Sequence, residues 1–201
     1  RRKEITKRGF MRRILLFVLL LSPALSFAAG EDYKNVLSAV TLDLDADGGF
    51  DRAVLEDDGN GAATLYIYAS KFDQKAKEFL PMSLQLVRRD MAWMGSMWGQ
   101  IPSLEVNSNG RLLIKAGNDS IGRGRWQQTV EVTFDSASQG YIVSALTYMS
   151  RDTLDLDAGG SCEIDFLKGE AKRNGKSVPY DKQVISISAW NNDVLPTICT
   201  F

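Results

Sequence analysis

The segment 43–51 carries aspartates at alternate positions, in the order Asp-Leu-Asp-Ala-Asp-Gly-Gly-Phe-Asp. Calcium is a hard cation that takes roughly six to eight oxygen ligands, and carboxylates spaced by two residues in a tight loop can surround it. The glycine at the sixth position permits the sharp turn that such a loop needs, and the seventh residue supplies a backbone carbonyl. The sequence therefore predicts one calcium site, with the ligands Asp43, Asp45, Asp47, Gly49 and Asp51.

An acidic turn without a metal is the alternative for this segment. Four neighbouring carboxylates would then repel one another, which makes the unliganded turn costly to hold. A related stretch, residues 153–158, repeats residues 41–46 one for one. The longer second copy, residues 153–163, has Gly159 where the first copy has an aspartate, so it is either an incomplete metal loop or an ordinary turn.

The residues around the loop separate two kinds of calcium site. A helical EF-hand would carry a glutamate at the twelfth position, where this chain has Val54. The pattern Asp-x-Asp-x-Asp-Gly-x-x-Asp, followed by an apolar strand, instead resembles the calcium loop of integrin-α-type FG-GAP and VCBS-like repeats over residues 37–68. This resemblance implies the same five ligands, and an extracellular or periplasmic β protein with an adhesive or binding function. It does not imply an enzyme.

The chain contains no histidine. This excludes Ser-His-Asp and Cys-His catalysis, histidine zinc sites and histidine proton relays. It contains two cysteines, Cys162 and Cys199, which are too few for a structural zinc site. An oxidising compartment would favour a disulfide between them, and two buried thiols are the alternative.

The first 28 residues have the order of an upstream extension followed by a secretory signal. Two arginines follow Met11, an apolar run covers residues 14–21, and a small-residue pattern ends at Ala28. This order is typical of a cleaved signal peptide, and the apolar run is shorter than the roughly 20 residues of a membrane-spanning helix. We therefore expect cleavage after Ala28, no stable membrane anchor afterwards, a single domain over residues 29–201, and a periplasmic or secreted location.

Removal of this segment makes the chain acidic. Residues 1–28 hold seven basic residues and one acidic residue, so residues 29–201 retain 17 Lys and Arg against 24 Asp and Glu, a formal charge of −7. A nucleic-acid-binding surface needs basic side chains that neutralise phosphates, so this balance argues against nucleic acid as a partner. It suits a protein that holds cations.

Alternating segments rich in β-branched residues predict strands at residues 36–44, 63–69, 111–115, 128–134, 141–147, 163–167 and 184–190. Turn signals separate them at residues 58–61, 107–110, 138–140 and 173–175. Residues 72–79 fit a short helix or, preferably, a hairpin that resumes at residues 82–87. We expect an all-β or mainly β fold with one disulfide, as a single antiparallel domain built as a sandwich or as incomplete propeller-like blades.

The segment 91–98 concentrates two of the four tryptophans and three of the six methionines. It predicts either core packing or an adaptable contact surface, with Trp93, Trp98, Trp126 and Trp190 as its aromatic members. The expected function is a calcium-stabilised envelope protein that binds another envelope protein or a glycan. The alternatives are a histidine-free hydrolase that uses paired carboxylates, and an inhibitor or accessory subunit of another envelope protein.

Overall fold

A computed structural model describes residues 35–73, 75–155 and 157–201 of the chain. The expected signal segment and its cleavage site lie outside the described residues. The unit Lys34–Phe201 is compact and contains every strand of the described residues. No helix in the described part of the chain is long and apolar enough to cross a membrane.

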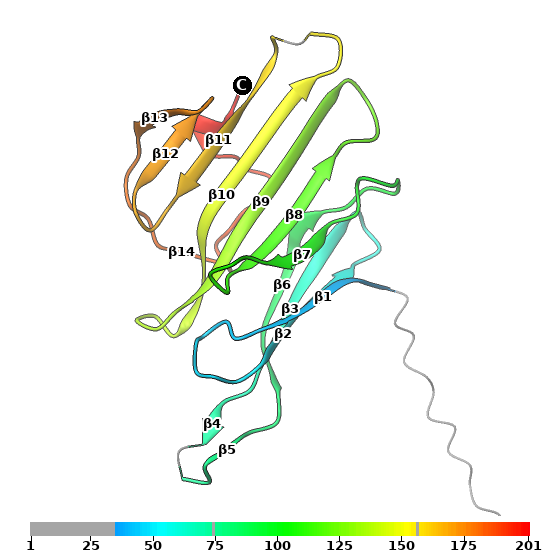
Figure 1. The fold of residues 1–201 in the computed structure, drawn as a ribbon. Helices are drawn as coiled ribbons and strands as arrows, with labels where there is room; N and C mark the ends of the chain where they lie inside the picture. The colour runs from blue at the N-terminus through cyan, green and yellow to red at the C-terminus, as the bar shows by residue number, and fades with distance from the viewer. Residues whose placement is uncertain (1–34, 74, 156) are drawn as a thin grey trace, which may run out of the picture. The chain divides into compact units, whose positions relative to one another are not determined.

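The first sheet has four antiparallel strands in the order β1-β2-β3-β6 (Figure 1). β3 alternates buried Leu65 and Ile67 with half-buried tyrosines, which is the period of a strand with one face in the core. A short hairpin of β4 and β5 joins β3 to β6. The bounds are β1 Val36–Leu42, β2 Asp51–Asp57, β3 Ala62–Ala69, β4 Phe72–Asp73, β5 Glu78–Phe79 and β6 Ser83–Trp93.

The second sheet has eight strands, seven of them in the order β13-β12-β11-β10-β9-β8-β7, and β14 pairs with β10. Each pairing within it is antiparallel. The bounds are β7 Ser103–Val106, β8 Leu112–Asn118, β9 Gly124–Asp135, β10 Gly140–Asp152, β11 Gly159–Asp165, β12 Glu170–Arg173, β13 Lys176–Pro179 and β14 Ile185–Ser186.

The two sheets share one hydrophobic core. Leu65 from β3, Leu112 from β8 and Val132 from β9 are fully buried members of the same cluster. At the sheet edges, the backbone N–H of Leu104 on β7 donates to Ser38 Oγ on β1 at 3.0 Å. The prediction of a mainly β, antiparallel fold is confirmed. The common core shows two packed sheets, as expected for a sandwich, rather than separate propeller-like blades.

The predicted hairpin at residues 72–79 is confirmed, because Phe72 pairs with Phe79 and their rings lie 5.0 Å apart. The prediction of a strand over residues 184–190 is wrong after Ser186, where β14 ends. The N–H groups of Ala189 and Trp190 both donate to the carbonyl of Ser186, so the chain turns there. Arg88 of β6 holds this turn by donating from Nε to the Ile187 carbonyl at 3.0 Å.

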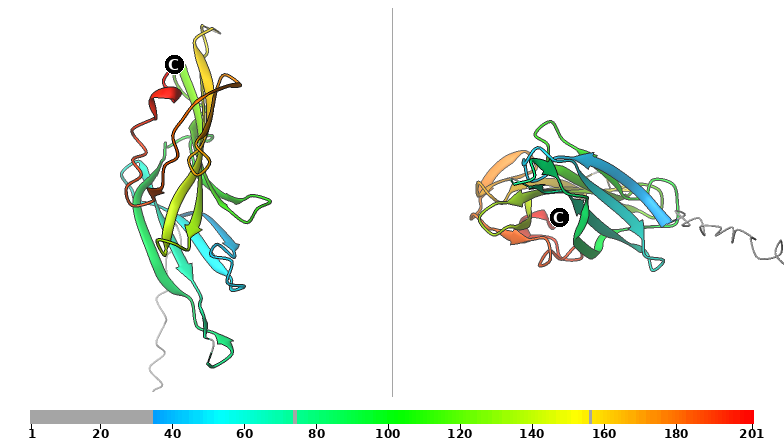
Figure 2. Two further views of the ribbon diagram at one scale, coloured as in Figure 1. Left: turned by 90° about the vertical axis from the view of Figure 1, so that its left-hand side faces the viewer. Right: turned by 90° about the horizontal axis from the view of Figure 1, so that it is seen from below.

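The predicted disulfide is confirmed. Cys162 of β11 is bonded to Cys199, which lies 37 residues later in the 3-10 turn η2 (Thr197–Cys199). Both cysteines are buried. Arg173 of β12 donates to the Thr200 carbonyl at 2.8 Å and lies over the Phe201 ring, so the last residues are held against this end of the second sheet (Figure 2).

Candidate metal centre

The predicted calcium loop joins β1 to β2 and is closed by the pairing of Leu42 with Asp51. The loop folds around its own carboxylates. The N–H of Asp47 donates to Asp43 Oδ1 at 3.1 Å and to Asp45 Oδ1 at 3.2 Å. The N–H of Gly48 donates to Asp43 Oδ2 at 3.0 Å, and a φ of 88° at this position requires the freedom of glycine.

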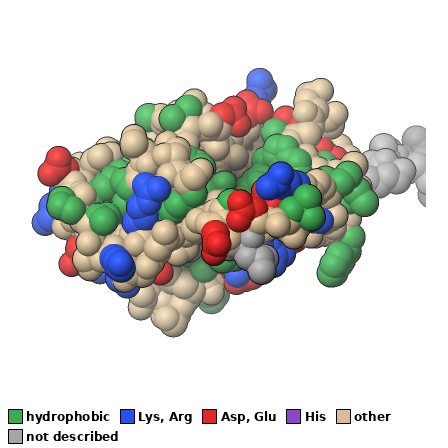
Figure 3. All heavy atoms as spheres, turned by 90° about the horizontal axis from the view of Figure 1, so that it is seen from above, with side chains coloured by type: hydrophobic (Ala, Val, Ile, Leu, Met, Phe, Trp, Pro, Cys, Tyr) green, Lys and Arg blue, Asp and Glu red, His purple; other side chains and the backbone are tan. Residues whose placement is uncertain are grey.

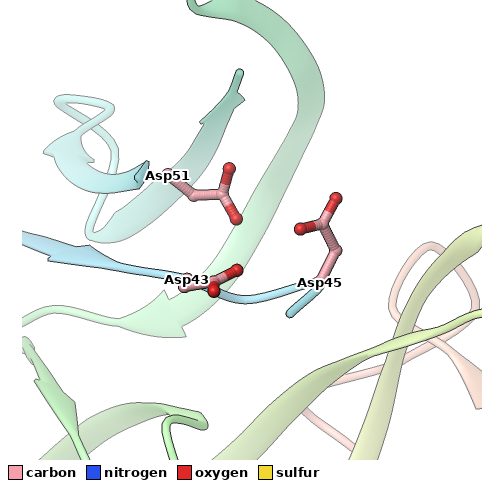
Figure 4. A group of neighbouring side chains, drawn as sticks. All are labelled: Asp43, Asp45 and Asp51. Carbon is pink, nitrogen blue, oxygen red and sulfur yellow. The ribbon is translucent and has the colours of Figure 1, made fainter. Parts of the chain in front are cut away.

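Three of the four aspartates come together. Asp43, Asp45 and Asp51 each offer a carboxylate oxygen, and these oxygens lie within 4.8 Å of one another. Figure 4 shows the three carboxylates converging on one space, with Asp43 and Asp45 on the loop and Asp51 at the start of β2. Like charges at this distance repel, so the arrangement is one that a cation would stabilise.

Asp51 is the most informative member of this group, because its side chain is 0% exposed. Its Oδ2 accepts a hydrogen bond from the Leu44 N–H at 2.9 Å. Its Oδ1 is also buried and has no hydrogen-bond partner among the described residues. A buried carboxylate oxygen without a partner costs a folded protein free energy, so a missing partner is expected at this position.

The pKa shifts of Asp51 and Asp45 also favour a cation beside these carboxylates. Burial raises the pKa of Asp51, and the charges of Asp45, Asp47 and Asp43 raise it further against the lowering effect of the Leu44 N–H. Burial is also the largest cause of the raised pKa of Asp45. Ionising a carboxyl whose pKa is higher in the folded chain than in the unfolded chain lowers the free energy of unfolding. This stability is present at low pH and is lost as the pH rises through the pKa of the folded state.

The other two predicted ligands have different surroundings. The Asp47 carboxylate lies outside the group of three, and its Oδ1 accepts a hydrogen bond from the Gly49 N–H at 2.7 Å. Gly49 is buried, and a Cβ atom there would lie 2.6 Å from Ser70 Oγ and 2.9 Å from Phe79 Cε1. The glycine is therefore required by close packing between the loop, the end of β3 and the β4–β5 hairpin.

We expect Gly49→Ala to lower the free energy of unfolding by about 1 to 2 kcal/mol, because the added methyl group must displace its neighbours. Chemical denaturation should detect this loss. Gly124→Ala at the start of β9 is the matched control, since neither glycine has a positive φ and a Cβ atom at Gly124 meets nothing within 4 Å. Equal losses in the two variants would show that close packing around Gly49 does not cause the effect.

Sequence reasoning missed one neighbour of the group. Tyr141 is the second residue of β10, far along the chain, and burial together with the charges of Asp51 and Asp45 raises the pKa of its hydroxyl to about 12. The hydroxyl is therefore neutral at physiological pH and can donate or accept a hydrogen bond beside the carboxylates. No local signal marks this residue, since only tertiary structure brings it to the loop.

The second copy of the aspartate pattern forms a turn between β10 and β11. Asp155 Oδ1 accepts a hydrogen bond from the Asp157 N–H at 3.2 Å. Glu163 lies on β11 and pairs with Lys172 of β12 at 3.3 Å. Within residues 35–73, 75–155 and 157–201, only the first copy gathers three carboxylates.

The four tryptophans lie in three different environments. Trp190 is buried against Phe166, with ring centroids 6.1 Å apart, and Trp93 packs on Trp126 at 5.5 Å. Trp98 is 92% exposed on the β6–β7 connection. Segment 91–98 therefore begins in the core and ends at the surface. The face in Figure 3 shows hydrophobic, basic and acidic side chains intermixed.

Comparisons of the chain with models of protein families, with curated proteins and with solved structures gave no match.

Proposed function

We propose that the chain is an exported binding protein whose β1–β2 loop is fixed by a calcium ion. The observation that carries this proposal is the buried, unpartnered Oδ1 of Asp51 beside the carboxylates of Asp43 and Asp45. A cation in the space between them would satisfy that oxygen and remove the repulsion within the group.

The chemistry of the donors favours calcium. All three side chains are carboxylates, which are hard oxygen ligands, whereas zinc sites draw on nitrogen and sulfur. Magnesium demands near-octahedral geometry at short distances, while calcium accepts an irregular arrangement of ligands. The resemblance of the loop to FG-GAP and VCBS-like repeats supports the same ion. The oxygens of the group are also closer than the roughly 5 Å or more between the carboxyl groups of a glycosidase.

Export is supported by two independent features. The order of charged, apolar and small residues before Ala28 is that of a secretory signal. The Cys162–Cys199 disulfide is of a kind that persists in oxidising compartments. Calcium sites of extracellular modules have dissociation constants on the order of 10⁻⁴ to 10⁻³ M, which is the range we expect here.

Asp51→Asn tests the proposal. The amide keeps an acceptor for the Leu44 N–H but removes the charge and places an N–H₂ group toward the other carboxylates. We expect calcium affinity, measured by isothermal titration calorimetry on the oxidised protein, to fall roughly tenfold to 100-fold, because a charge-assisted contact is lost. In the presence of chelator the variant should be at least as stable as the wild type, because the amide can donate to Asp43 or Asp45.

Asp193→Asn is the matched control, because it makes the same change of charge at an exposed position after the β14 turn. It should leave calcium affinity unchanged. If the wild-type chain binds no calcium at millimolar concentration, or if Asp51→Asn binds it as tightly as the wild type, the site is an acidic turn and the proposal fails.

A further inference from the structure

A cleft of about 660 Å³ opens beside the calcium loop. Asp45 and Asp47 form part of its wall, so Asp45 belongs both to the cleft and to the group of three carboxylates. The remaining walls come from the β3–β4 connection, from β6, from the β9–β10 turn and from the segment around β14 (Figure 1). A cleft of this volume is within the range of about 300 to 1,000 Å³ that binds small ligands.

The walls combine aromatic rings with neutral hydrogen-bonding groups. Phe72, Phe134 and Tyr141 line the cleft, and all three are partly buried with part of their surface open. Phe134 and Tyr141 hold each other edge to face, with ring centroids 5.5 Å apart. Gln85 of β6 and Gln139 of the β9–β10 turn add amides. Aromatic faces and amides together suit a ligand with both apolar C–H surfaces and hydroxyl groups.

The charges in the cleft restrict the ligand further. Asp45 and Asp47 disfavour an anion, and Lys71 is the basic residue that accompanies them. A cation held by Asp45 would border the cleft, and the three carboxylates do not complete its coordination. Backbone N–H groups already donate to Asp43 Oδ1, Asp43 Oδ2, Asp45 Oδ1 and Asp51 Oδ2, whereas calcium takes roughly six to eight oxygens.

We propose that this cleft binds a carbohydrate, with neighbouring hydroxyl groups of one sugar ring completing the coordination of the calcium ion and with the ring lying against the aromatic wall. This inference rests on the proposed calcium site. Tyr141 and Asp45 line the same cleft, so the aromatic wall and one of the three carboxylates face a common space. The bound calcium has two tasks in this arrangement, since it fixes the loop and presents open positions to the sugar.

The test uses the calcium-loaded, oxidised protein with D-mannose, D-galactose, D-glucose and N-acetyl-D-glucosamine as probes. Saturation-transfer difference NMR should show binding of at least one sugar, and chelator should weaken that binding at least about tenfold, since a coordination bond is lost. The double variant Gln85→Ala/Gln139→Ala should weaken sugar binding about tenfold, because two amide hydrogen bonds are lost. Its calcium affinity, titrated separately, should equal that of the wild type.

Asn109→Ala in the exposed β7–β8 turn removes an amide away from the cleft and should change neither affinity. If the protein binds calcium but none of the four sugars, the carbohydrate inference is overturned while the calcium site stands. If the sugar binds equally well with calcium and with chelator, the proposal that the calcium ion coordinates the sugar hydroxyls is overturned. A chain that binds no calcium in the direct titration contradicts the proposed function itself.

Discussion

Removal of calcium from the oxidised protein should lower its thermal midpoint by about 5 to 10 °C. A ligand at one hundred times its dissociation constant stabilises the folded chain by about 2.7 kcal/mol, and each kcal/mol corresponds to about 2 to 4 °C for a domain of this size. The physical source of this effect is the group of three carboxylates, whose repulsion and unpartnered Asp51 oxygen remain when the ion is absent. Differential scanning calorimetry with saturating calcium and with chelator measures the shift.

Magnesium at the same concentration is the control for ionic strength and general charge screening. It should give a much smaller shift, because it dehydrates reluctantly and requires a more regular site. A shift of the same size in Asp51→Asn as in the wild type would show that calcium acts elsewhere on the chain. If calcium left the thermal midpoint of the wild type unchanged, the loop would be an acidic turn that binds no ion.

Reduction of the Cys162–Cys199 disulfide should lower the free energy of unfolding by about 4 kcal/mol. The bond closes a loop with a sequence separation of 37, and the loss of loop-closure entropy in the unfolded chain gives this magnitude. The corresponding fall in thermal midpoint is about 8 to 16 °C. Denaturant titrations of the oxidised protein and of the reduced protein measure the difference.

A Cys162→Ala/Cys199→Ala double variant separates the covalent bond from the reductant. It should be destabilised to a similar extent, and added reductant should have no further effect on it. Its calcium affinity should remain that of the wild type, because the disulfide joins β11 to η2 while the loop joins β1 to β2. A destabilisation below about 1 kcal/mol in both experiments would contradict the loop-entropy account.

Local sequence patterns predicted most of the strands and the group of three carboxylates. The alternation around Leu65 and Ile67 survives in β3 because one face of that strand is buried. The spacing of Asp43, Asp45 and Asp51 predicted their convergence because the loop between β1 and β2 is short. Both signals depend only on residues close in sequence.

The predictions failed where distant residues decide the structure. Ile185 and Ile187 alternate like a strand, yet only Ile185–Ser186 pairs, because Arg88 of β6 holds the following residues in a turn. β12 is short and largely polar, and only Ala171 of its residues is buried, so its periodicity is weak. The sequence also could not distinguish whether Asp47 faces an ion or the Gly49 N–H, since the same spacing serves both.

The strand order of the second sheet has a consequence for how the chain folds in time. Each strand from β8 to β13 pairs with its immediate predecessor in sequence, so the sheet can grow one hairpin at a time as the chain is synthesised. No early strand of this series must wait for a distant one. The Cys162–Cys199 bond requires a residue that follows β13 in sequence, so it can form only after every strand of this series has been synthesised, and it then locks the sheet.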